Sequence, residues 1–138
     1  MTGSRQRPPP YLDYLLQVSE SATWVCSVCE GALLLAQAGL LGGHKATTHW
    51  AFIACLSQFP EIAVDQKHQR FIVSENASGK RLTGGGISSG LDESLKLIEL
   101  LFGEEVAKDV QVTTQYFPKS PVSGSLPANS PPCPMKWT

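Results

Sequence analysis

Apolar and polar residues are spaced along the chain in a way that predicts helices separated by short strands. Apolar residues recur at helical spacing in the longer stretches, and β-branched and aromatic residues gather in short runs between them. The expected helices cover residues 11–21, 30–41, 49–59, 87–103 and 104–116. The expected strands cover residues 23–28, 46–48, 61–64, 70–75 and 80–85. This order favours an α/β fold with a partly parallel sheet that has helices on its faces.

The two ends of the chain have a different composition from the middle. Residues 1–10 are polar and end in three prolines, so we expect a disordered lead-in. Residues 118–138 are rich in Pro and Ser, which favours an extended tail lying on the surface. The α/β domain is therefore expected over residues 11–117.

Charge and hydropathy exclude several classes of function. The formal net charge is -1 and 17% of residues are charged, which predicts no nucleic-acid partner and no anionic membrane partner. No apolar run is long enough to span a bilayer, and the first residues lack the apolar stretch of a signal peptide. We therefore expect a cytoplasmic protein in a reducing compartment. In that setting Cys26, Cys29, Cys55 and Cys133 are expected to be thiols rather than a disulfide framework.

The segment Ser27-Val28-Cys29-Glu30-Gly31 lies where an expected strand turns into an expected helix. A nucleophile elbow needs small residues two positions before and two after the nucleophile, and Ser27 and Gly31 meet that demand. The helix N-terminus would favour a thiolate at Cys29. The backbone N–H of Glu30 would then point to where an oxyanion forms. The alternative is a small buried cysteine that ends a strand without chemistry.

Cys26 and Cys29 have the spacing of a thioredoxin-type redox pair. Cys26 lies inside the expected strand, however, and residues three apart in an extended strand are separated by about 10 Å. A disulfide requires Cα atoms within about 7 Å of each other, so this pairing is disfavoured.

A two-Cys, two-His zinc site is the second competing interpretation. Fourteen residues separate Cys29 from His44, and His49 follows. The intervening segment is a core-type helix, too apolar for the exposed face of a zinc finger, so we expect no metal. Of the other histidines, His68 lies in a polar stretch and is expected to be solvated. His49 follows an expected strand and should lie at the same sheet edge as Cys29.

The glycine run Thr83-Gly84-Gly85-Gly86 ends a strand and precedes a helix. It does not fit the dinucleotide-binding pattern, because Ser89 stands where the third glycine belongs. We interpret it as a tight turn beside a pocket, since ligand crevices form at the carboxyl ends of strands.

At these residues the sequence resembles the ThiJ/PfpI superfamily, from about Tyr11 to about Pro127. It is most similar to the isonitrile hydratase-like branch, which has a similar S-V-C-x-G-A elbow and A-T-T-H-W strand. The matching stretches are residues 24–41, 46–50, 83–95, 110–118 and 121–122. The resemblance implies a three-layer, flavodoxin-like sheet of the class I glutamine amidotransferase type. It also implies Cys29 as nucleophile and His49 as the histidine near it.

Three departures from the family pattern change what can be expected. Members usually begin with βα units that supply an acid beside the cysteine and a Gly-containing oxyanion loop, so we expect a sheet that is incomplete on its N-terminal side. Hydratases of this branch commonly have Thr after the cysteine, where this chain has Glu30, a residue able to act as an acid or to complement the helix dipole. Ala51 stands where a glutamine amidotransferase would have its acid, which disfavours that reaction.

The resemblance implies a cysteine-dependent hydratase or hydrolase that adds water to a small electrophilic substrate such as an isonitrile, with no cofactor. The expected catalytic residues are Cys29, Glu30 and His49, and the expected oxyanion and pocket residues are Glu30, Gly31, Gly85 and Gly86. A truncated, catalytically weak or inactive paralogue, which acts through its thiol as a stress or binding module, is the alternative. The ligand-sensing half of an AraC-type regulator is a third, for which the Pro-rich tail offers no helix-turn-helix. An unpaired strand edge beside Cys26 would favour a homodimer.

Overall fold

The computed structural model describes residues 8–137, and helices and strands alternate along them as expected. The helices are α1 (Pro10–Ser19), α2 (Gly31–Gln37), the 3-10 helix η1 (Trp50–Phe52), α3 (Ile53–Leu56), α4 (Ser89–Phe102) and α5 (Glu104–Thr113). The strands are β1 (Trp24–Ser27), β2 (Lys45–Ala46), β3 (Ala63–Val64), β4 (Phe71–Asn76) and β5 (Gly79–Gly84). The expected lead-in falls mostly on residues 1–7, which lie outside the described part. α1 already begins at Pro10, a residue suited to the first turn of a helix.

The strands form two small sheets, and the expectation of a partly parallel arrangement is confirmed. β1 pairs in parallel with β5, and β5 pairs antiparallel with β4 through the tight turn between Asn76 and Gly79. β2 pairs in parallel with β3 in a separate two-stranded sheet. Within residues 8–137, β1 is the last strand of the order β1-β5-β4 and has a neighbour on one side.

Two of the expected helices are much shorter than their apolar patterns suggest. The helix expected over residues 30–41 ends at Gln37, and Gly39 then adopts a φ of 77°, a left-handed conformation that glycine tolerates without strain. The helix expected over residues 49–59 divides into η1 and the single turn of α3. Aromatic residues such as Trp50 and Phe52 favour helices only weakly, which accounts for the 3-10 start.

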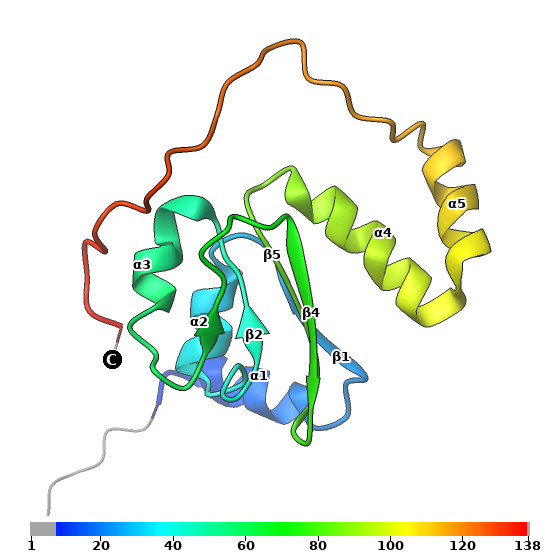
Figure 1. Ribbon diagram of the computed structural model, residues 1–138. Helices are drawn as coiled ribbons and strands as arrows, with labels where there is room; N and C mark the ends of the chain where they lie inside the picture. The colour runs from blue at the N-terminus through cyan, green and yellow to red at the C-terminus, as the bar shows by residue number, and fades with distance from the viewer. Residues whose placement is uncertain (1–7, 138) are drawn as a thin grey trace, which may run out of the picture.

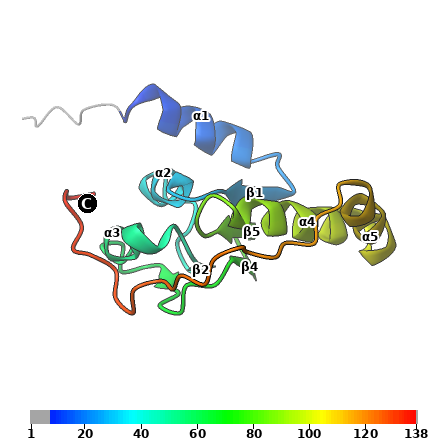
Figure 2. The same cartoon turned by 90° about the horizontal axis from the view of Figure 1, so that it is seen from above.

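The hydrophobic core lies around α2 and α3. Leu33, Leu41 and Leu56 are almost completely buried, and residues of α1, β2 and the segment before β3 join them. Figure 2 shows α1 on the outer side of α2, so that α2 is covered from outside as well as from the strands. In Figure 1, α4 and α5 lie on the opposite side of the strands from α2 and α3. Within residues 8–137, no helix is long and apolar enough to cross a membrane.

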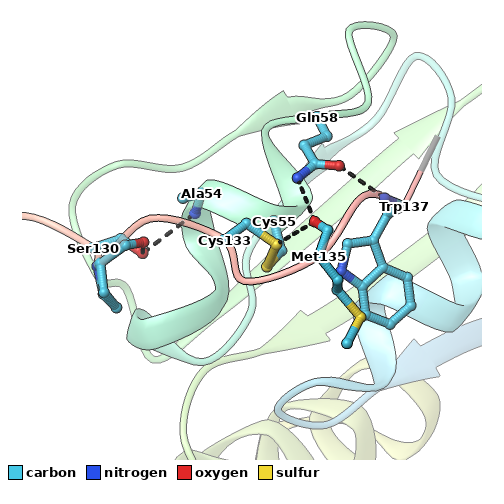
Figure 3. Close-up of a disulfide and its surroundings, with 8 residues drawn as sticks. Ala54, Cys55, Gln58, Ser130, Cys133, Met135 and Trp137 are labelled. Carbon is cyan, nitrogen blue, oxygen red and sulfur yellow. Dashed lines mark hydrogen bonds between the residues drawn. A yellow bond between two sulfur atoms is a disulfide. The ribbon is translucent and has the colours of Figure 1, made fainter.

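The C-terminal tail corrects one prediction about the cysteines. The tail has no helix or strand, as expected, and it runs from α5 across the molecule back to α3 (Figure 1). There Cys133 forms a disulfide with Cys55 of α3, with the two Cα atoms 4.9 Å apart (Figure 3). The prediction of four thiols is therefore wrong for Cys55 and Cys133, because residues 78 positions apart are brought together by the path of the tail. Cys26 and Cys29 are free.

Candidate functional site

Cys29 lies on a sharp turn between β1 and α2. Its φ is 55°, in the left-handed region that non-glycine residues rarely adopt. The turn is closed by a hydrogen bond of 2.9 Å from the Gly31 N–H to the Val28 carbonyl. A Cβ added at Gly31 would lie 3.5 Å from the Ser27 Cβ, an ordinary contact, so this elbow is less crowded than expected. A strained backbone at a strand-to-helix turn is the conformation in which nucleophile elbows present their reactive side chain.

The loop after β2 is fastened directly to this elbow. The buried Thr48 hydroxyl donates a hydrogen bond of 2.8 Å to the Cys29 carbonyl. His49, the next residue, therefore follows a segment anchored at the cysteine, and Cys29 itself is half-buried. The Glu30 side chain is exposed at the N-cap of α2 and makes no capping hydrogen bond. An acid at that position suits the helix dipole.

The His49 ring is held in one orientation by its neighbours. Its Nδ1 accepts a hydrogen bond of 3.1 Å from the Ala51 N–H, so the neutral ring carries its proton on Nε2. A Cβ added at Gly86 would lie 3.2 Å from the His49 Cδ2, so the absence of a side chain at Gly86 makes room for the ring. His49 is thus arranged to donate a hydrogen bond through Nε2.

A cavity of about 570 Å³ opens beside His49. It brings together three of the expected site residues, His49, Gly85 and Gly86. Its lining residues are Thr48, His49, Trp50, His68, Gln69, Arg70, Gly85, Gly86, Ile87, Ser88, Ser89 and Leu126. Cys29, Glu30 and Gly31 are not among them. The Gly85 N–H is already bonded to the Arg70 carbonyl at 2.9 Å, so it is not a free oxyanion donor.

His68 corrects another expectation. It is half-buried rather than solvated, and its Nε2 lies 3.2 Å from the Pro127 carbonyl oxygen. The polar residues around it in the sequence gave no sign of this contact, because its partner lies in the tail.

Glu93 is an acid that the sequence interpretation missed. Its side chain is buried on α4, and neither carboxylate oxygen has a hydrogen-bond partner among the described residues. It lies directly over Gly84, where an added Cβ would collide with the carboxylate. Burial raises the pKa of Glu93 to about 7. The sequence could have indicated this burial, because Glu93 lies four residues after Ser89 and four before Leu97. That spacing places all three residues on one face of the helix.

Cys26 lies on the same side of the sheet as Glu93. Partial burial of the thiol, and then the nearby Glu93 charge, raises the pKa of Cys26 to about 11. Ordinary pH therefore leaves Cys26 almost entirely as the thiol. The two free cysteines of this chain thus lie in very different surroundings, although they are three residues apart.

The histidines of the zinc pattern are engaged elsewhere. Both ring nitrogens of the buried His44 lie 3.0 Å from serine hydroxyls, those of Ser74 and Ser78. Burial, followed by the nearby Arg81 charge, lowers the pKa of His44 and favours the neutral ring. Within residues 8–137, no group of three or more His, Cys, Asp or Glu side chains is placed to hold a metal ion.

Comparison with known proteins identifies the family. The model of the DJ-1/PfpI family matches residues 3–100. This chain belongs to the DJ-1/PfpI family. It is 38% identical over 120 residues to an isonitrile hydratase of Pseudomonas putida. This match covers 87% of this chain and 50% of the hydratase. It is also 30% identical over 109 residues to the HTH-type transcriptional regulator CdhR of Pseudomonas aeruginosa. That match covers 78% of this chain and 30% of the regulator. The chain therefore spans half or less of the length of these relatives.

Solved structures agree with this assignment and with the expected fold class. A ThiJ/PfpI family protein from Pseudomonas syringae superposes with a TM-score of 0.75 at 30% identity, over 90% of this chain and 48% of that protein. An oxidised DJ-1 of Toxoplasma gondii superposes with a TM-score of 0.61 at 28% identity, over 77% of this chain and 53% of the other. The mixed α/β fold is thus that of the ThiJ/PfpI proteins.

Proposed function

We propose that this chain carries the nucleophile of a cysteine-dependent hydratase that adds water to an isonitrile and gives an N-formamide. The left-handed backbone of Cys29, at the turn from β1 to α2, is the observation that carries the proposal. The 38% identity to an isonitrile hydratase supports the choice of substrate class.

The proposed reaction needs a thiolate, a proton donor and water. The Cys29 thiolate attacks the terminal carbon of the isonitrile, and a proton delivered to that carbon gives a covalent thioformimidate. Water then adds to the same carbon and the carbon–sulfur bond breaks. The thiolate returns to its starting state and the product leaves as the N-formamide, so the net change is addition of one water molecule.

Three side chains are candidates for the proton transfers. His49 can donate through Nε2, because Nδ1 is occupied by the Ala51 N–H. Glu30 follows the nucleophile directly and is open to solvent. Glu93, whose pKa is raised to about 7, is about half protonated at neutral pH and can therefore serve as a general acid. It lies against Gly84, the residue after Thr83, which pairs with Ser27 at the end of β1.

An assay for N-formamide formation from an aliphatic isonitrile tests the proposal. We expect turnover, in which a general acid and an oxyanion donor each contribute on the order of a hundredfold to the rate. Cys29→Ala should abolish this turnover. Cys26→Ala is the matched control, since it removes the other free thiol three residues away, and should retain it. Equal product formation by Cys29→Ala and the unaltered protein would contradict the proposal.

A second candidate function is a thiol-based binding or stress module with little or no catalysis. The observation that favours it is that Cys29 does not line the cavity beside His49. In this case Cys29 would react with electrophiles once, without turnover. A single equivalent of adduct that accumulates on Cys29, with no N-formamide released, would distinguish this function from the hydratase.

Association and location are further parts of the proposal. We propose that two copies associate along β1, which ends its sheet within the described residues and is followed by the exposed Val28. Sedimentation velocity tests this, and a stable monomer at micromolar concentration would contradict it. The cytoplasmic location predicted from composition also stays a proposal, although the Cys55–Cys133 disulfide is a bond that reducing compartments disfavour.

A further inference from the structure

Residues 117–137, which we call the strap, connect two distant parts of the molecule. They leave α5, cross the molecule without helix or strand and return to α3 (Figure 1). At the far end, the Gln58 side chain donates a hydrogen bond of 2.9 Å to the Met135 carbonyl and accepts one of 2.8 Å from the Trp137 N–H. The Ala54 N–H donates a bond of 3.3 Å to the Ser130 hydroxyl (Figure 3). The strap is therefore docked at one end on α3 and on Gln58, which follows it.

The middle of the strap forms part of the cavity beside His49. Leu126 is one of the residues that line this cavity. The His68 Nε2 donates a hydrogen bond of 3.2 Å to the carbonyl of Pro127, the next residue. His68 itself lines the cavity and is held with a φ of 54°. A segment far away in the sequence thus covers one side of the space in which His49 and Gly86 lie.

The disulfide that attaches the strap joins a buried cysteine to a half-buried one. Cys55 is fully buried in the hydrophobic core on α3, whereas Cys133 is half-buried in the strap. Cys133 and Trp137 pack against the edge of that core. The hydrogen bonds named above also attach the strap, at α3 and at His68. Exposed hydrogen bonds of this kind are individually weak. The disulfide is therefore the strongest attachment of the strap.

We propose that the strap is a redox-controlled cover of the cavity beside His49, held closed by the Cys55–Cys133 disulfide. In the closed state Leu126 and Pro127 exclude bulky ligands from that side of the cavity. A dithiol reductant attacks the half-buried Cys133 sulfur, the S–S bond breaks, and two electrons and two protons convert the pair into two thiols. The reductant leaves as its own disulfide. The strap then detaches around Leu126, and the side of the cavity that it covered becomes open to solvent.

The cover does not rest on the hydratase proposal. Its test therefore uses readouts that need no turnover. The three histidines of the chain provide an internal comparison. His49 and His68 line the cavity, whereas His44 is buried with both ring nitrogens against serine hydroxyls.

The experiment measures carbethoxylation of each histidine by diethyl pyrocarbonate, mapped by mass spectrometry, before and after reduction with dithiothreitol. We expect modification of His68 to rise about threefold or more on reduction and that of His44 to stay unchanged, since local opening exposes only the groups it uncovers. Tryptic cleavage after Lys136 should rise with it, while cleavage after Lys80, in β5, should not. Cys133→Ser should show the open pattern without reductant. Cys26→Ser should respond to reductant like the unaltered protein.

Two outcomes would contradict the proposal that the strap is a redox-controlled cover. One is unchanged His68 modification and unchanged cleavage after Lys136 in protein whose mass shows both cysteines reduced. The other is an equal rise at His44, which would mean that the whole domain loosens. Failure of the hydratase proposal looks different: the histidine pattern would change on reduction as described, and no N-formamide would form in either redox state.

Discussion

The two helical layers of this protein look alike in the sequence and differ in the structure. α2 and α3 contribute fully buried leucines, among them Leu33 and Leu56. In α4 the buried residues are Ser89 and Glu93, and large apolar side chains such as Leu101 and Phe102 remain exposed. Apolar spacing indicates which face a helix can bury, but it does not say whether another element covers that face.

The reason for the difference is the number of neighbours around each helix. α2 lies between the strands and α1, whose Leu12 joins the core. α4 packs against β5 on one side and α5 on another, and further apolar residues of both helices face outward. The α2 layer should therefore carry most of the stability, and the α4 layer should tolerate change.

The largest expected effect on stability comes from a matched pair of leucine substitutions. Leu33→Ala, in the α2 layer, should lower the free energy of unfolding by about 3–5 kcal/mol, because it leaves a cavity in a packed core. Leu101→Ala, in the α4 layer, should change it by less than about 0.5 kcal/mol, since the side chain is 47% exposed. Urea unfolding measures both. Equal losses would show that the two layers are equally packed.

The next effect concerns the disulfide, which fastens the strap to the α3 layer. Cys133→Ser should lower the free energy of unfolding by about 4.5 kcal/mol on the loop-entropy account, because the bond closes a loop with a sequence separation of 78. Cys26→Ser is the control and should change little. If reduction left the unfolding midpoint of the unaltered protein where it was, the strap would not contribute to stability.

A smaller, pH-dependent effect belongs to Glu93 in the α4 layer. Its pKa is raised from 4.5 to about 7, so the folded state holds a proton that the unfolded state loses between these values. Its contribution to stability is complete below pH 4.5 and is lost as the pH rises through 7, with a span of about 3 kcal/mol. Glu93→Gln should remove that fall and be the more stable protein at pH 8. Parallel stability profiles for the two proteins between pH 5 and 8 would contradict the burial of an unpaired acid.

Sequence patterns predicted the local structure well, and they missed what depends on distant contacts. The elbow at Cys29 could be predicted, because a strand run, two small flanking residues and a helix run lie within a few positions. The alternation of helices and strands and the turn before Gly79 could be predicted for the same reason. The Cys55–Cys133 bond could not, since nothing near Cys133 specifies that the tail returns to α3. The burial of Glu93 depends on Gly84 of another element.

The same contrast between local patterns and distant contacts holds for the site residues. His49 was expected beside Cys29 from the family resemblance, and the Thr48 bond to the Cys29 carbonyl now gives that expectation a physical basis. The contact of His68 with Pro127 joins residues far apart in the chain, and the polar sequence around His68 therefore predicted exposure. The roles of Cys29, Glu30 and His49 stay predictions until they are measured.

Pulse alkylation of the two free cysteines tests the central claim most directly, because Cys26 serves as a control within the same molecule. Cys26 is the more exposed residue, but with a pKa of about 11 only about one thiol in ten thousand is ionised at pH 7. We expect a brief iodoacetamide pulse on the disulfide-intact protein at pH 7 to label Cys29 first, as mass mapping would show. Labelling of Cys26 ahead of Cys29 would contradict the assignment of Cys29 as the nucleophile of the elbow.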